Sequence, residues 1–78
     1  MGEDHPTTAA SYNNLGNAYG SLGKNNEALV AFQAALGARR RTLGEEHVST
    51  KRSYAAVASA LERVGRAAEA QEFKAKAK

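Results

Sequence analysis

The sequence of 78 residues predicts an all-α protein made of two helical hairpins, with four antiparallel helices. The first observation behind this prediction is an internal repeat, because the chain resembles itself at an offset of 42 residues. The second is the helical spacing of apolar residues within each repeat. The third is a glycine where each of the first three helices should end. We expect a single domain, with repeat one over residues 2–43 and repeat two over residues 44–78.

The internal repeat is clear when residues 2–36 are set against residues 44–78. Eleven of these 35 positions are identical. The residues of repeat one that recur are Gly2, Glu3, His5, Thr8, Ser11, Tyr12, Ala18, Gly23, Glu27, Ala28 and Ala35. Self-similarity at this period indicates one supersecondary unit used twice.

The first helix is expected over residues 6–22. At about 100° per residue, one arc of this helix collects its large apolar side chains, and we expect that arc to face the neighbouring helices. Its members are Tyr12, Leu15, Ala18, Tyr19 and Leu22. Pro6 suits the first helical turn, where its missing N–H is no loss. Gly23 supplies the left-handed residue that often follows a helix C-terminus.

The second helix is expected over residues 26–43. Its apolar stripe consists of Ala28, Leu29, Phe32, Ala35 and Leu36. Gly44 should end it, while Gly37 lies inside it at a cost of about 1 kcal/mol relative to alanine.

The third helix is expected over residues 48–64, and Gly65 should end it. Its apolar arc repeats that of the first helix with Tyr54, Val57, Ala60, Leu61 and Val64. A fourth helix over residues 67–76 is poorer in large apolar side chains. Connections of two to five residues make consecutive helices antiparallel neighbours.

The spacing of aromatic, glycine and alanine residues resembles the tetratricopeptide signature. The residues that carry this resemblance are Tyr12, Leu15, Gly16, Tyr19, Gly23, Ala28, Phe32 and Ala35 in repeat one, and Tyr54, Val57, Gly65 and Ala70 in repeat two. The longer period and the junction from Leu43 to His47 are similar to the kinesin light chain subclass, except that Val48 stands where that subclass has proline. The resemblance implies a short α-solenoid with a peptide-binding concave groove, in which Gly16 permits close helix packing.

Repeat two departs from the signature in both of its helices. In the third helix, Ala58 stands in the position of Gly16 and Leu61 in that of Tyr19. In the last helix, Lys74 occupies the position of Phe32, and Phe73 comes one place earlier. Two interpretations of the last helix follow, namely a terminal cap or a helix rotated in register.

The resemblance also implies that the polar face of the first helix of each repeat lines the groove. The candidate residues are Asn13, Asn14, Asn17, Gly20 and Ser21 in repeat one, and Arg52, Ala55, Ser59, Glu62 and Arg63 in repeat two. Asparagine both donates and accepts hydrogen bonds, so it can hold the backbone of a bound peptide. The alternative is that the asparagines are solvated surface residues, although asparagine is a mediocre helix former.

The leading functional hypothesis is therefore a protein-interaction module with a protein or peptide partner. A structural role is the second hypothesis, because two repeats leave outer hairpin faces uncovered and these could bind a second copy. We also expect the chain to be a piece of a longer repeat array. A weaker third hypothesis is nucleic-acid binding by residues 37–78, which hold ten basic and five acidic residues. Its densest cluster, Arg39-Arg40-Arg41, has no interleaved aromatic for base stacking and is expected to be a solvated helix end.

Catalysis and metal binding find no support in the sequence. There is no cysteine, which excludes disulfides and thiolate ligands. His5 and His47 are expected to be junction residues, since each lacks a second ligand at short spacing. We expect neither an enzyme nor a cofactor. No apolar run approaches the roughly 20 residues of a membrane span, and a cytoplasmic location is expected, with cytoskeletal association if the subclass resemblance holds.

Overall fold

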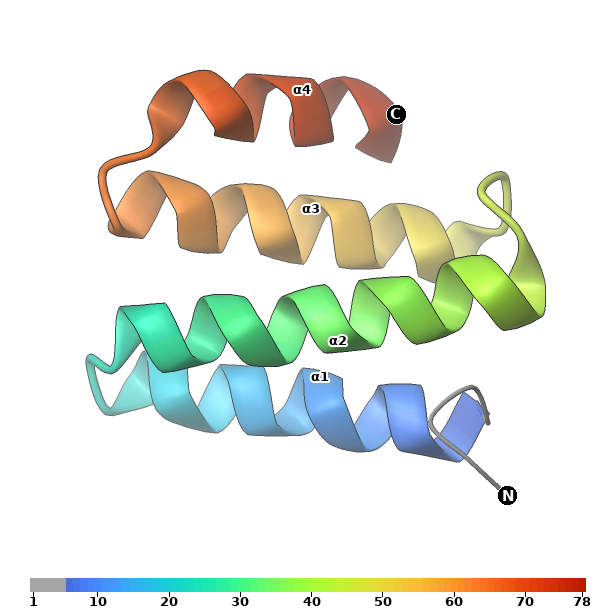
Figure 1. Cartoon of the computed structure of the whole chain (residues 1–78), viewed down its shortest axis with the longest axis horizontal. Helices are drawn as coiled ribbons and strands as arrows, with labels where there is room; N and C mark the ends of the chain where they lie inside the picture. Colours follow the sequence, from blue (N-terminus) through green and yellow to red (C-terminus); the bar gives the residue numbers. More distant parts are fainter. Residues whose placement is uncertain (1–5) are drawn as a thin grey trace.

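The four helices lie side by side in chain order (Figure 1). The computed structural model describes residues 6–78, with side chains from residue 8 onward. Its helices are α1 (Pro6–Ser21), α2 (Asn25–Leu43), α3 (Val48–Arg63) and α4 (Ala67–Ala77). Each begins and ends within one residue of its predicted bounds. Because α1 packs on α2, α2 on α3 and α3 on α4, the predicted all-α fold of two stacked hairpins is confirmed.

The glycines that follow α1 and α3 build the same turn twice. Gly23 and Gly65 have φ angles of 78° and 85°, in the left-handed region that a Cβ disfavours. The same hydrogen bond follows each glycine, in which the next amide donates to a carbonyl five residues before it: Lys24 to Tyr19 at 2.9 Å and Arg66 to Leu61 at 2.8 Å. This bond satisfies a carbonyl at the helix end and reverses the chain. The sequence repeat therefore reproduces the turn as well as the helices.

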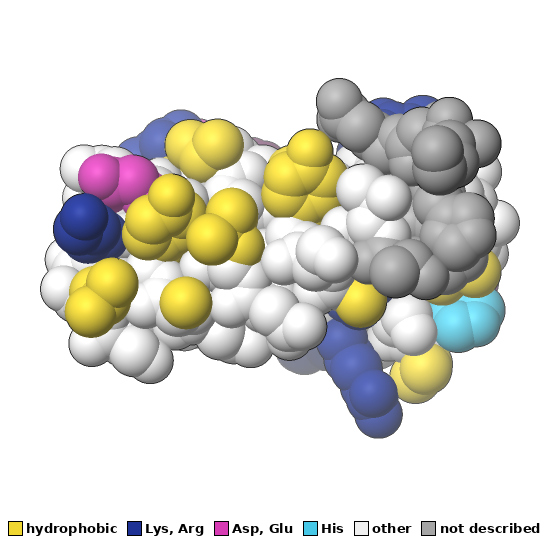
Figure 2. Space-filling model, turned by 90° about the horizontal axis from the view of Figure 1, so that it is seen from below, with side chains coloured by type: hydrophobic (Ala, Val, Ile, Leu, Met, Phe, Trp, Pro, Cys, Tyr) yellow, Lys and Arg dark blue, Asp and Glu magenta, His cyan; other side chains and the backbone are white. Residues whose placement is uncertain are grey.

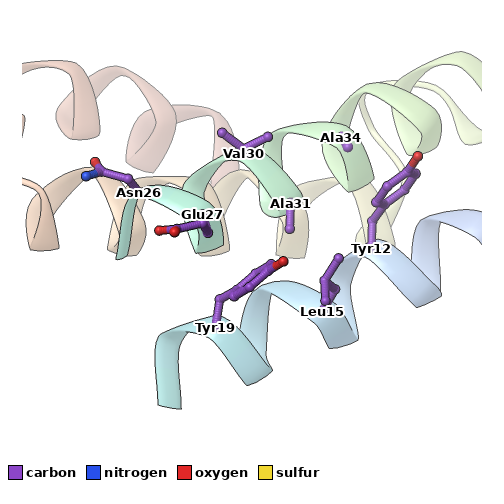
Figure 3. A pocket seen from close by; sticks show the side chains of 8 residues that line it. All are labelled: Tyr12, Leu15, Tyr19, Asn26, Glu27, Val30, Ala31 and Ala34. Atoms are coloured by element: carbon purple, nitrogen blue, oxygen red, sulfur yellow. The ribbon is translucent and has the colours of Figure 1, made fainter. Parts of the chain in front are cut away.

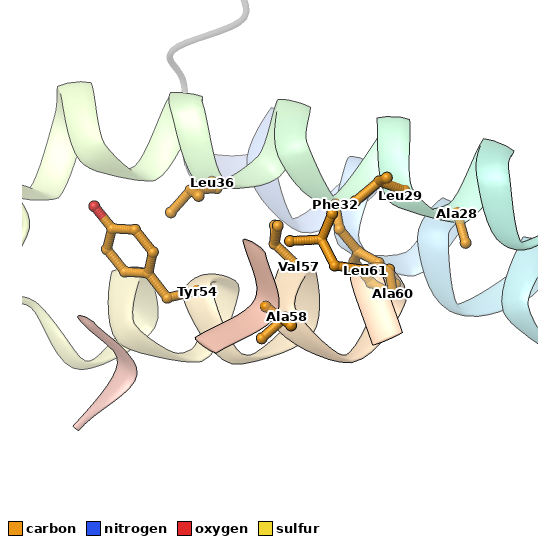
Figure 4. Packing of buried hydrophobic residues seen from close by; sticks show 10 residues of the cluster. Ala28, Leu29, Phe32, Leu36, Tyr54, Val57, Ala58, Ala60 and Leu61 are labelled. Atoms are coloured by element: carbon orange, nitrogen blue, oxygen red, sulfur yellow. The ribbon is translucent and has the colours of Figure 1, made fainter. Parts of the chain in front are cut away.

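The core lies largely between α2 and α3 (Figure 4). The predicted stripe of α2 is buried there against Tyr54, Val57, Ala58, Ala60 and Leu61 of α3. Arg39 crosses this interface, because its Nη1 donates to Ser53 Oγ at 2.8 Å. Thr50 Oγ1 donates in return to the Arg39 carbonyl at 3.3 Å. The buried hydroxyls of Thr50 and Ser53 are thus hydrogen-bonded, as buried polar groups should be.

Tyr54 ties the α2–α3 loop to α3. Its side chain is 2% exposed, and its hydroxyl donates to Glu45 Oε1 at 3.1 Å. Burial, followed by this hydrogen bond, raises the pKa of the Tyr54 hydroxyl. The same hydrogen bond, followed by the positive charge of Arg40, lowers the pKa of the Glu45 carboxyl. The carboxylate of Glu45 in the loop therefore accepts a charge-assisted hydrogen bond from the buried side chain of Tyr54, and this bond holds the loop against α3.

The last helix packs without a phenylalanine at the position of Phe32. Ala70 is fully buried, and the ring centroid of Phe73 lies 6.0 Å from that of Tyr54. Lys74, which occupies the position of Phe32, is exposed. Ala70 is buried, as is its counterpart Ala28 in repeat one, so α4 keeps the register of α2. The aromatic side chain of α4 comes from Phe73, one residue before the position that corresponds to Phe32.

Gly16 of α1 packs against the ring of Phe32 of α2 with no room for a side chain. A Cβ built on Gly16 would lie 2.6, 2.7 and 2.9 Å from three ring atoms of Phe32, which is well inside van der Waals contact. The equivalent residue in α3 is Ala58, which is 1% exposed. Its counterpart across the hairpin is Lys74 instead of a phenylalanine. Gly16 therefore goes with the bulky ring of Phe32. Repeat two has no ring at the corresponding position, which explains why Ala58 can carry a methyl group there.

The predicted apolar arc of α1 is only partly covered. Leu15 is 44% and Leu22 71% exposed, so the expectation that both pack against neighbouring helices is wrong. Tyr12 and Tyr19 are half-buried, and from residue 8 onward the buried residues of α1 are Ala9 and Gly16. The physical reason is that α2 covers the equivalent arc of α3, whereas no described helix lies against that side of α1.

Candidate functional site

A shallow hollow of about 140 Å³ lies between α1 and α3, with part of α2 as its floor. Three predicted groove residues line it, namely Asn17 from α1 and Ser59 and Arg63 from α3. The remaining lining residues are Asn25, Ala28, Phe32, Ala56 and Ala60. The hollow therefore combines polar groups at its rim with an apolar floor, a combination typical of binding sites.

The polar groups of the hollow are available to a ligand. Asn17, Ser59 and Arg63 are exposed, and their side chains form no hydrogen bond or ion pair with any described residue. The Arg63 side chain lies over Gly20, since its Nη1 would be 3.2 Å from a Cβ built on that glycine. Gly20 thus leaves room for a guanidinium that reaches from α3 to α1. Together these side chains can donate and accept several hydrogen bonds.

The other predicted groove residues lie on the same two helices but outside the hollow. Asn13 is half-buried, whereas Asn14, Ser21, Arg52 and Ala55 are exposed. The structure leaves them accessible beside the hollow without bringing them into it.

Glu62 departs from the predicted arrangement. Its carboxylate forms an ion pair with Lys74 of α4, so the Glu62 side chain is directed toward α4 and not toward α1. The reason is the helical period, because a residue next to Arg63 points about 100° away from it. With Glu62 neutralised by Lys74, the cations Arg52 and Arg63 dominate the charge of this face.

Asn25 and Ala56 line the hollow although sequence reasoning did not select them. The prediction placed the groove on the first helix of each repeat only, whereas the N-terminus of α2 also reaches it through Asn25. A signal was present in the sequence, since Asn25 follows directly on the turn built by Gly23. Ala56 is half-buried and offered no such signal.

The run of three arginines does not form one basic patch. Arg39 is held at the α2–α3 interface by Ser53, and Arg40 Nη2 lies 3.5 Å from Glu45 Oε2. Successive residues on a helix point in different directions, as the sequence indicated. This arrangement disfavours a shared contact with nucleic-acid phosphates.

His47 caps the N-terminus of α3. Its Nδ1 accepts a hydrogen bond of 3.0 Å from the amide of Ser49, which otherwise has no helical partner. His5, the other predicted junction residue, lies outside the described residues. Within residues 6–78, no group of three or more His, Cys, Asp or Glu side chains is arranged to hold a metal ion.

Stacked hairpins with a repeated turn and a repeated apolar arc define a helical-repeat protein. The sequence matches the tetratricopeptide repeat model over residues 8–49, more than half of the chain. The chain therefore belongs to the tetratricopeptide repeat family, a non-catalytic repeat scaffold whose members generally mediate protein–protein interaction. A search of curated proteins finds no match. Among the described helices, none is long and apolar enough to cross a membrane.

Proposed function

We propose that this chain is a protein-interaction module that binds a peptide segment of a partner along the α1/α3 face. The observation that carries this proposal is the hollow in which Asn17, Ser59 and Arg63 surround an apolar floor. An amide, a hydroxyl and a guanidinium can hydrogen-bond the backbone of an extended peptide, and the floor can receive one small apolar side chain.

The charge of this face favours an acidic segment. Arg63 has no acidic partner among the described residues, and Glu62 is neutralised by Lys74. Arg52 adds a second exposed cation on the same helix. A peptide carboxylate placed on Arg63 would form a charge-assisted hydrogen bond, which is stronger than one between neutral groups.

Chemical-shift mapping with short glutamate-rich peptides, and with versions carrying lysine in place of glutamate, tests the proposal. We expect shifts around the hollow with the acidic peptides, and a loss of about tenfold in affinity for Arg63→Ala, as for one charged hydrogen bond. Asn17→Ala should weaken binding by a smaller factor. Gln71→Ala, at an exposed position of α4, is the matched control. Shifts confined to α2 and α4, or equal affinity of all variants, would refute this function.

We further propose the kinesin light chain-like subclass, on account of the 42-residue period and the junction from Leu43 to His47. On this proposal, residues 1–78 form one domain of two repeats. The domain binds its partner without catalysing a reaction on it, and it lies in the cytoplasm. Mass spectrometry of a bound peptide tests the absence of catalysis, because a changed mass contradicts it. Microscopy of a fluorescently tagged chain tests the location.

A further inference from the structure

The α1/α3 face carries two exposed arginines on one side of α3. Arg52 and Arg63 are eleven residues apart in the chain. Eleven residues make three helical turns and about 20° more, so both side chains leave α3 in nearly the same direction, about 16 Å apart along its axis. Ala56 and Ser59 lie on the same side between them, and together with Arg63 they line the hollow between α1 and α3. Arg52 therefore lies one turn beyond the end of this hollow.

The charges of these two arginines are not neutralised by the described residues. The third cation of α3 is Lys51, which forms an ion pair of 3.6 Å with Glu46. Neither Arg52 nor Arg63 has an acidic partner among the described residues. Helix α1, which forms the opposite wall, contains no charged residue. The face therefore offers two positive charges about 16 Å apart, with no carboxylate on the opposite wall to repel an acidic ligand.

The larger hollow of the molecule has a different character. It measures about 360 Å³ and lies on the outer face of the α1–α2 hairpin, between Tyr12, Leu15 and Tyr19 of α1 and Glu27, Val30 and Ala34 of α2 (Figure 3). Hydrophobic side chains gather on this side of the molecule (Figure 2). Glu27 is the one charged residue that the described part of the chain contributes to the lining. Charge therefore directs an acidic segment to the α1/α3 face and not to the outer hollow.

An extended peptide can contact both arginines at once. Such a peptide rises about 3.3 Å per residue, and its side chains alternate between two sides. Two acidic residues on the same side are therefore an even number of positions apart. Four positions span about 13 Å and six span about 20 Å, so each differs by only about 3 Å from the separation of the arginines, which flexible side chains can absorb. Two positions span about 7 Å and leave one arginine without a partner.

We propose that Arg52 and Arg63 select the spacing of acidic residues in the bound segment, and that this segment is an extended peptide with two carboxylates four or six positions apart. The inference rests on the proposed function and adds the spacing to it. One carboxylate binds Arg63 at the hollow, and the other binds Arg52 one turn beyond Ala56, each through charge-assisted hydrogen bonds. A small apolar residue between the two acids lies over the floor of the hollow, and Asn17 on the opposite wall binds the peptide backbone. The spacing is the same for either direction of the peptide.

A series of peptides made of glycine, serine and alanine, with both termini blocked, tests the spacing. One peptide carries a single glutamate, and the others carry two glutamates that are two, four, six or ten positions apart. Titration into the whole chain at low salt measures the affinity, because salt screens exposed ion pairs. We expect the peptides with spacings of four and six to bind about fivefold more tightly than the single-glutamate peptide, and those with spacings of two and ten to gain at most about twofold, the statistical advantage of a second glutamate.

Variants of the chain show which arginine reads the second acid. Arg52→Ala should remove the extra affinity of the peptides with spacings of four and six, while the single-glutamate peptide binds as before. Arg63→Ala should weaken the binding of every peptide in the series. Lys78→Ala is the matched control, because it removes an exposed cation at the end of α4 and should keep the spacing preference. Far-UV circular dichroism checks that each variant is folded.

The outcomes separate this inference from the function on which it rests. Equal affinity at all spacings, or a spacing preference that persists in Arg52→Ala, overturns the inference. The proposed function survives either result if single-glutamate binding still depends on Arg63. Absence of any Arg63-dependent binding refutes both. Chemical-shift changes at Val30 without changes at Ser59 would place the acidic peptide on the outer hollow and would also overturn the inference.

Discussion

Replacing Gly16 by alanine is expected to destabilise the fold, although alanine is the better helix former. The added Cβ would lie 2.6–2.9 Å from the ring of Phe32, and this ring is 9% exposed in the core. Either the ring must turn or α1 must move away from α2. Both changes disturb the packing of Gly16 against Phe32.

The magnitude follows from two opposing terms. Removing glycine from a helix interior stabilises by about 1 kcal/mol. Forcing an extra carbon into a packed contact costs about 1–3 kcal/mol. Gly16→Ala should therefore lower the free energy of unfolding by about 1 kcal/mol, which corresponds to a fall in Tm of about 4–8 °C for a domain of this size.

Urea unfolding followed by far-UV circular dichroism measures this difference. Gly37→Ala is the matched control, because its Cβ would lie 3.4 Å from Arg41 Nη1 at the end of a flexible side chain. It should stabilise by about 0.5–1 kcal/mol. In the double variant Gly16→Ala/Phe32→Leu, the alanine should cost less than it does alone. If Gly16→Ala is as stabilising as Gly37→Ala, the reasoning about close helix approach is wrong.

Two further substitutions probe α4 and the α2–α3 loop. Phe73→Ala should cost about 1.5–2.5 kcal/mol, roughly half the value of a fully buried phenylalanine, whereas Lys74→Ala should stay within about 0.5 kcal/mol in the same urea assay. Equal costs would contradict the packing described for α4. The pKa of the Glu45 carboxyl is lowered by Tyr54, so its contribution to stability is present above its ordinary pKa of 4.5 and is lost as pH falls through the lower folded-state pKa. Unfolding measured over this pH range should therefore show a shallower loss of stability below pH 4.5 in Glu45→Gln, and an unchanged slope would exclude this contribution.

The helix boundaries were predictable because local chemistry determines them. Gly23, Gly44 and Gly65 all adopt the positive φ that ends a helix, and this property belongs to glycine itself. The apolar stripe of α2 was equally predictable, since it packs against α3 inside the same molecule. The resemblance to the tetratricopeptide signature was likewise visible in the sequence, and the family model that matches residues 8–49 confirms it.

The candidate site was predictable only in part. The polar faces of α1 and α3 were identified, but the hollow takes just Asn17, Ser59 and Arg63 from them and adds Asn25 from α2. Glu62 was assigned to the groove and instead pairs with Lys74. Such outcomes depend on the distance and rotation between helices, which residue spacing along one helix does not contain.

By itself, the sequence determined that this protein consists of four helices and where they end, because periodicity and glycine act within a few residues. Only the tertiary structure decided which side of each helix is covered. Tyr12 and Tyr54 occupy the same position in their repeats, yet Tyr54 is buried and Tyr12 borders an open hollow. The physical reason is that burial depends on what packs against a residue. Within residues 6–78, α3 has a helix on both sides, whereas α1 has one neighbour, α2.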